Sequence, residues 1–83
     1  MGFSHLELKD HIESHHNWDL VKNGEWHIDH IFPLKAFFKN RIYDVKIINC
    51  LENLQPLSNV ENSKKGDEYC EIEFNLFLES KLE

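Results

Sequence analysis

The stretch WHIDHIFPL, residues 26–34, sets an aspartate and a histidine side by side among bulky apolar residues. Trp26, Ile28 and His30 alternate with His27, Asp29 and Ile31, and the turn-prone pair Asn23-Gly24 precedes them, which together predict a strand over residues 25–31. Pro33 lacks the backbone N–H that a strand ladder uses, so the strand is expected to stop before it. The acid and the imidazole therefore belong to the end of a strand.

A second motif, NLQPL at residues 53–57, predicts another strand, and Pro56 places that strand at a sheet edge. Ser58 and Glu61 have the spacing of a capping box, which predicts a helix beginning directly after the strand. Gly66 is placed to end that helix. Strand, long loop, strand and helix make a small ββα unit.

In this order, WHIDHIxP, NLQPL and ENxxKG resemble the HNH nucleases, the ββα-metal superfamily, in their His-Asn-Asn form. Small phage and bacterial HNH endonucleases are especially similar. The resemblance is close over residues 26–66 and implies a ββα-metal core there, within a single nuclease domain spanning residues 1–83. Many members hold a structural zinc with two CxxC pairs. Ser58 and Glu61 stand where one such pair often lies, so no structural zinc is expected.

The resemblance also implies roles for four side chains, and the chemistry of each side chain suits its role. Asp29 offers a hard anionic oxygen and Asn62 a neutral carbonyl oxygen to one divalent ion, Mg²⁺ or Mn²⁺, with other divalent ions also open. His30 is the expected general base, because the pKa of an imidazole lies near the working pH. Asn53 is expected to hold the loop against the first strand and to fix the orientation of His30.

Other histidines and several cations are further candidates. His27 shares a strand face with Asp29 and could face the metal or substrate, but a structural or peripheral role is favoured. His11 and His15 have the i, i+4 spacing of helical metal ligands, but no third ligand is evident and a solvated helix face is favoured. Four basic residues are expected to contact DNA phosphates: Lys65, Lys64, Arg41 and Lys39.

The remaining segments predict an α+β fold around this core. Ser4 and Glu7 form a capping box for a helix over residues 3–16. Residues 34–43 are expected to form a mixed loop, and Asp44 is placed to cap a short helix over residues 45–49. The tail from Cys70 onward fits both strand and helix spacing, and its final residues favour a C-terminal helix. The predicted order along the chain is therefore helix, ββα core, helix.

Composition limits the function classes. Eighty-three residues suit one domain, or a fragment of a larger protein, and bury only about 60% of their unfolded surface. The sequence has no apolar run of about 18 residues, so no membrane span is predicted. It has two cysteines and no CxxC pair, which favours a reducing cytoplasm. The net charge of −6 argues against a nucleic-acid partner, but residues 27–66 hold six basic and four acidic residues, a net +2.

The sequence therefore favours a metal-dependent DNA endonuclease that hydrolyses phosphodiester bonds, located in the cytoplasm of a bacterial host or encoded by a phage. One alternative is an HNH-fold module that binds nucleic acid or protein without cutting. Another is the nuclease fragment of a longer protein. Double-strand cleavage by such a site calls for a homodimer, a second event or a larger phage or bacterial assembly.

Overall fold

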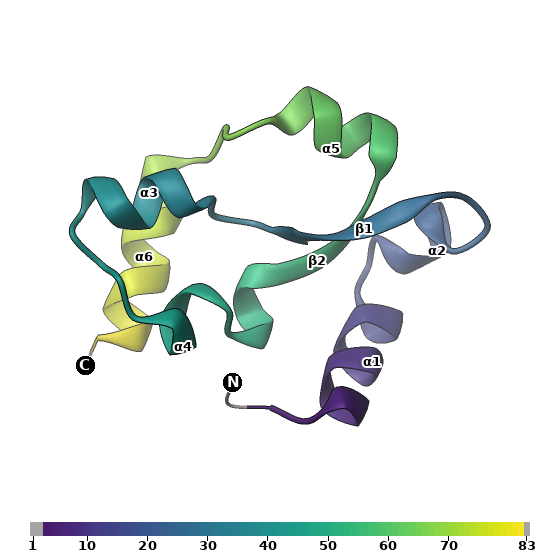
Figure 1. Ribbon diagram of the computed structural model, residues 1–83, viewed down its shortest axis with the longest axis horizontal. Coiled ribbons are helices and arrows are strands. Elements are labelled where there is room, and N and C mark those ends of the chain that lie inside the picture. The colour runs from purple at the N-terminus through teal and green to yellow at the C-terminus, as the bar shows by residue number, and fades with distance from the viewer. Residues whose placement is uncertain (1–2, 83) are drawn as a thin grey trace.

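Two antiparallel strands form the sheet: β1 (Trp26–His30) and β2 (Leu54–Ser58) (Figure 1). Their register places Asp29 opposite Gln55. These are the two strands predicted from the motifs. The structure is a computed structural model that describes residues 3–82.

Short-range sequence signals explain the starts of three helices and the end of one. The capping box of Ser4 and Glu7 is present at the first helix, and the Asp44 carboxylate accepts a hydrogen bond from the backbone N–H of Lys46. Gly66 ends the helix after β2 with φ +53°, a backbone conformation that glycine adopts without strain. The helices are α1 (His5–Ser14), α2 (Trp18–Val21), α3 (Leu34–Lys39), α4 (Val45–Ile48), the 3₁₀ helix η1 (Leu51–Asn53), α5 (Asn59–Lys65) and α6 (Glu71–Lys81).

The α+β class and the helices at both ends of the chain are confirmed, but the expected loop over residues 34–43 is wrong in its first half. Helix α3 occupies residues 34–39, preceded by Pro33 in an extended conformation. A helix of six residues is too short to show a clear period in the sequence. Packing stabilises it, because Ala36 and Phe37 are completely buried.

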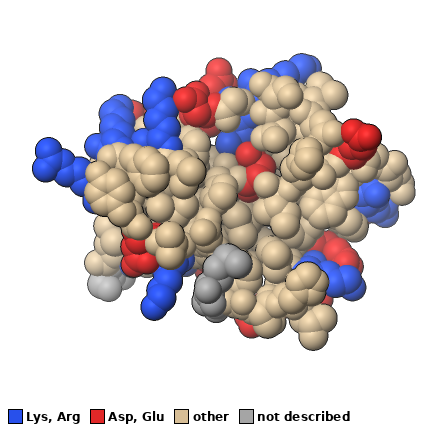
Figure 2. All heavy atoms as spheres, viewed as in Figure 1, with Lys and Arg blue, Asp and Glu red and all other residues tan. Residues whose placement is uncertain are grey.

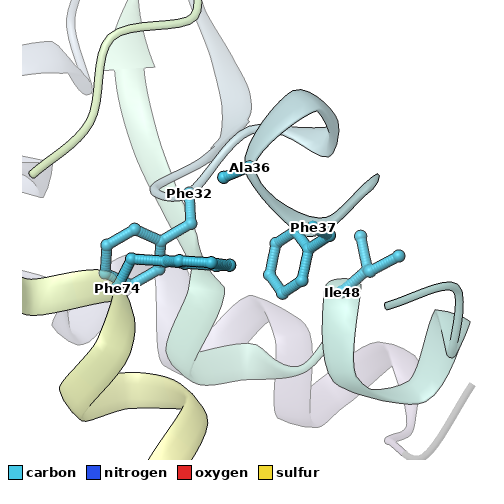
Figure 3. Packing of buried hydrophobic residues seen from close by; sticks show 5 residues of the cluster. All are labelled: Phe32, Ala36, Phe37, Ile48 and Phe74. Carbon is cyan, nitrogen blue, oxygen red and sulfur yellow. The ribbon is translucent and has the colours of Figure 1, made fainter. Parts of the chain in front are cut away.

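The hydrophobic core lies among α3, α4 and α6, at the end of the molecule where β1 finishes (Figures 1 and 3). The rings of Phe37 and Phe74 meet edge to face with centroids 5.1 Å apart, an arrangement that aromatic pairs prefer. Phe32, Ala36 and Ile48 complete the buried cluster. Helix α6 thus closes a core that begins just past the strand carrying the acid–histidine pair.

The N-terminal helices pack elsewhere, against β2. Ile12 of α1 and Val21 of α2 are buried, and the His11 ring nitrogen Nε2 lies 2.7 Å from the Leu54 carbonyl oxygen. Among residues 3–82, no helix combines the length and the apolar character that crossing a lipid bilayer requires.

Candidate active site

A pocket of about 330 Å³ gathers several of the residues predicted to act together. It lies between the end of β1, the start of α3 and the helix α5. Three of the four residues with predicted roles line it, together with one of the predicted phosphate-binding lysines. Those four are Asp29, His30, Asn62 and Lys65, and the rest of the lining is Ile28, Pro33, Leu34, Lys35, Gly66 and Asp67.

The Asp29 carboxylate is held through one of its two oxygens. Gln55 on the facing strand donates from Nε2 to Oδ2 at 2.9 Å, and the Lys65 ammonium lies 3.3 Å from the same atom. The Asp29 and Lys65 side chains are only 10% and 20% exposed, so solvent screens this pair weakly. Oδ1 takes part in no hydrogen bond within residues 3–82, which leaves it available to a ligand.

Lys65 also joins the two walls of the pocket. Its Nζ donates to the backbone carbonyl of His30 at 2.9 Å, in addition to pairing with Asp29. Because Lys65 is on α5 and both partners are on β1, this one side chain holds helix against strand. Lys65 is also one of the residues that line the pocket.

The imidazole of His30 contacts an amide that the motifs did not single out. Its Nε2 lies 2.7 Å from Oδ1 of Asn49, the residue that caps the C-terminal end of α4. Asn49 is 19 residues away in sequence. No local signal marks it, because the contact depends on how the chain brings the end of α4 to the end of β1.

Asn53 is completely buried and bonded on three sides. Its Oδ1 accepts from the Phe32 N–H at 2.8 Å, while its Nδ2 donates to the carbonyls of Phe32 at 3.2 Å and Ile48 at 2.8 Å. Its backbone carbonyl accepts from Ile31 N–H at 2.8 Å, which extends the pairing of the strands beyond β1. The Asn53 side chain therefore joins the segment after β1 to the end of α4, and its described hydrogen bonds do not include the His30 ring.

Asn62 lies in α5 with its side chain outside any hydrogen bond in the described chain. The pocket lining thus includes two hard oxygen donors, Asp29 Oδ1 and the Asn62 amide oxygen, that accept no described hydrogen bond. This pair of donors suits Mg²⁺ or Mn²⁺. Residues 3–82 contain no cluster of three or more His, Cys, Asp or Glu that could hold a metal. An ion here would depend on the Asn62 carbonyl and on water or substrate oxygens.

The other predicted cations lie outside the pocket lining. Lys39 at the end of α3 pairs with Glu71 at 3.2 Å, and that hydrogen bond and charge raise the lysine pKa. Arg41 and Lys64 are exposed. Lys35, which does line the pocket, pairs with Asp67 at 3.2 Å. Figure 2 shows basic side chains gathered over α3, with acidic groups among them.

The remaining histidines do not join this pocket. His27 is exposed on β1 and is not among the residues that line it. His11 contacts β2 through the Leu54 carbonyl, and His15 Nδ1 accepts from the backbone N–H of Asn17 at 3.1 Å. These contacts give His11 and His15 structural partners, where a solvated helix face was expected.

Sequence reasoning missed Gln55 and Asn49. Gln55 was within reach, because an antiparallel register that pairs the two motifs places it directly opposite Asp29. A scan against family models, a search of curated proteins and a search of solved structures found no match to this chain.

Proposed function

We propose that this protein is a metal-dependent DNA endonuclease of the HNH, or ββα-metal, type. The observation that carries the proposal is the meeting of Asp29, His30 and Asn62 at one pocket, although Asn62 is 32 residues beyond His30 in the chain. The order of β1, β2 and α5, with α5 contacting both strands, is the order that the resemblance to HNH nucleases implies.

In this proposal, Asp29 and Asn62 would hold one divalent ion, Mg²⁺ or Mn²⁺. When bound, the ion would neutralise charge on the phosphate and on the departing oxygen. His30 would accept a proton from water as the water oxygen attacks phosphorus. The bond from phosphorus to the 3′ oxygen would then break, giving the 5′-phosphate and 3′-hydroxyl products that the family resemblance implies.

A bound divalent ion would suit the pocket to an anionic substrate in spite of the acidic chain. Lys65 and Lys35 line the pocket but pair with Asp29 and Asp67, so these four charges cancel, and the ion would add two positive charges beside them. In the proposal Lys65 would contact a phosphate, and Lys64, Lys39 and Arg41, all exposed, would contact further phosphates. DNA as the partner and a homodimer or larger phage or bacterial assembly belong to this proposal, as does a cytoplasmic location.

One contact favours a second candidate, an HNH-fold module that binds DNA or protein without cutting. The Lys65 ammonium already neutralises Asp29 at 3.3 Å, so the carboxylate does not require a metal for charge balance. A protein that works only by binding would keep this ion pair in all states.

A plasmid nicking assay separates the two candidates. Supercoiled DNA is incubated with the protein and Mg²⁺ or Mn²⁺, with EDTA as the metal-free arm. The variants are His30→Ala and the matched His5→Ala, which removes an exposed imidazole from the start of α1. Metal-dependent nicking by the wild type and His5→Ala, lost in His30→Ala, supports the nuclease. DNA binding by fluorescence anisotropy without nicking in either metal overturns it in favour of the binding module, and undiminished nicking by His30→Ala refutes the assigned base.

A further inference from the structure

The ring of His30 has one described hydrogen-bond partner, the amide oxygen of Asn49. The chemistry of that oxygen determines which ring nitrogen carries the proton. Nε2 lies 2.7 Å from Asn49 Oδ1. An amide oxygen only accepts hydrogen bonds, so the neutral imidazole satisfies this contact only with its proton on Nε2. Nδ1 is then left with its lone pair free, and it takes part in no hydrogen bond among residues 3–82.

We propose that Asn49 is a positioning residue that holds His30 as the Nε2–H tautomer and directs Nδ1 toward the pocket as the proton acceptor. The catalytic meaning of this contact rests on the proposed nuclease function. The contact and the tautomer do not, so they can be tested without DNA or metal.

Asn49 can do this because several interactions fix its own place. Its backbone N–H donates to the Val45 carbonyl at 2.9 Å at the end of α4, and Ile48 beside it is buried in the core. The carbonyl of Ile48 accepts from Asn53 Nδ2 at 2.8 Å. These bonds hold the backbone of Asn49 in place, so its side-chain oxygen has little freedom to move away from the imidazole.

The same arrangement gives Asn53 an indirect part in orienting the base. Its side chain bonds Phe32, two residues after His30, and Ile48, one residue before Asn49. It therefore fixes the separation of the two segments that carry the imidazole and its acceptor. Asn53 holds the two segments together, and Asn49 makes the contact with the His30 ring.

The test is an NMR measurement on the metal-free protein at alkaline pH. A ring N–H exchanges rapidly with water unless a hydrogen bond protects it, so a one-bond ¹H–¹⁵N cross-peak reports the bond. His30→Gln assigns the peak to this ring, and strong long-range ¹H–¹⁵N couplings to both ring C–H protons identify the nitrogen as Nε2. We expect the peak in the wild type and its loss in Asn49→Leu, which has a similar volume and no acceptor. Asn49→Asp should keep it, because a carboxylate also accepts.

Asn40→Leu is the matched control, because Asn40 also caps a short helix, α3, and its side chain bonds only the Ala36 carbonyl. Its spectrum should retain the His30 peak. If Asn49→Leu fails to fold by circular dichroism, the wild type and Asn49→Asp decide, because a donating Asn49 amide would require an unprotonated Nε2 and the wild type would then show no protected peak. The assignment is overturned by absence of the peak in the wild type, by its survival in Asn49→Leu or by its loss in Asn49→Asp.

Nicking kinetics then test the catalytic part. Misplacement of a catalytic group by about 1 Å can cost on the order of a hundredfold, so Asn49→Leu should lower kcat roughly tenfold to a hundredfold with KM little changed. Asn49→Asp should restore most of kcat. Equal kcat in Asn49→Leu and wild type refutes the positioning role. Absence of nicking by the wild type itself refutes the nuclease function, while the NMR result still decides the contact.

Discussion

Replacing Asn53 with aspartate changes almost no volume but reverses the polarity of two buried hydrogen bonds. Oδ1 can still accept from the Phe32 N–H, as it does at 2.8 Å. The second oxygen of Asp would face the carbonyls of Phe32 and Ile48, which now receive hydrogen bonds from Nδ2 at 3.2 and 2.8 Å. Both carbonyls would lose their donor, and a carboxylate would be buried against them or would bind a proton.

The expected loss of stability follows from those two bonds. Leaving a buried polar group unsatisfied costs about 1–3 kcal/mol, so two carbonyls amount to about 2–6 kcal/mol before the buried charge is considered. A chain of this length has a total stability of about 4–12 kcal/mol. We therefore expect Asn53→Asp to lose about 4 kcal/mol or more, which is a large part of the total.

Urea unfolding followed by tryptophan fluorescence and circular dichroism measures this loss. With a slope of about 1 kcal/mol per molar urea for a small domain, the midpoint should fall by roughly 4 M, or the variant should be unfolded in buffer. Asn23→Asp is the matched control: the same chemical change at an exposed turn, expected to stay within about 0.5 kcal/mol. A loss below about 1 kcal/mol in Asn53→Asp would refute the reasoning about these bonds.

Charge and exposure lead to three further expected outcomes. Lys65→Met should bind Mn²⁺ several-fold more tightly in the absence of DNA, as measured by electron paramagnetic resonance, because the Asp29 carboxylate loses the ammonium that lies 3.3 Å away. Lys22→Met removes the lysine of an exposed ion pair and should leave Mn²⁺ binding unchanged. Burial and two neighbouring histidines lower the pKa of His15 from its ordinary 6.5. The unfolded chain therefore binds a proton at His15 more readily than the folded chain, and stability falls as the pH drops below 6.5. Between pH 7 and pH 5, the urea midpoint should fall less in His15→Gln than in the wild type. Cys70 is exposed, whereas burial raises the pKa of the half-buried Cys50 thiol, so mass spectrometry after brief iodoacetamide treatment should find Cys70 alkylated first, and faster reaction of Cys50 would contradict this.

Local signals were sufficient for the elements that carry the motifs. Alternation with a proline stop indicated β1, and Ser58 followed by Glu61 indicated α5, whose first N–H groups include one bonded to the Ser58 hydroxyl. These signals act over a few residues, so one sequence reveals them. The C-terminal helix was harder, because its apolar residues fit two periods, and its packing against Phe37 through Phe74 favours the helix.

What could not be predicted depends on contacts between distant segments. Helix α3 lacks a clear period, and burial of Ala36 and Phe37 against α6 stabilises it. The partner of His30 is Asn49, which requires the end of α4 to lie near the end of β1. A motif predicts the types of residue at a site, but the support around them comes from the packing of the whole chain.

The position of α5 shows how closely the stability and the proposed chemistry are joined. None of its residues is fully buried, so hydrophobic burial holds it only weakly against the sheet. Lys65 supplies polar bonds to Asp29 and to the His30 carbonyl instead. In the proposed nuclease, an ion shared by Asp29 and Asn62 would join the same helix to the same strand. Metal and lysine would therefore serve as alternative links between α5 and β1, and a lysine released from Asp29 by the ion would be free to contact the phosphate beside it.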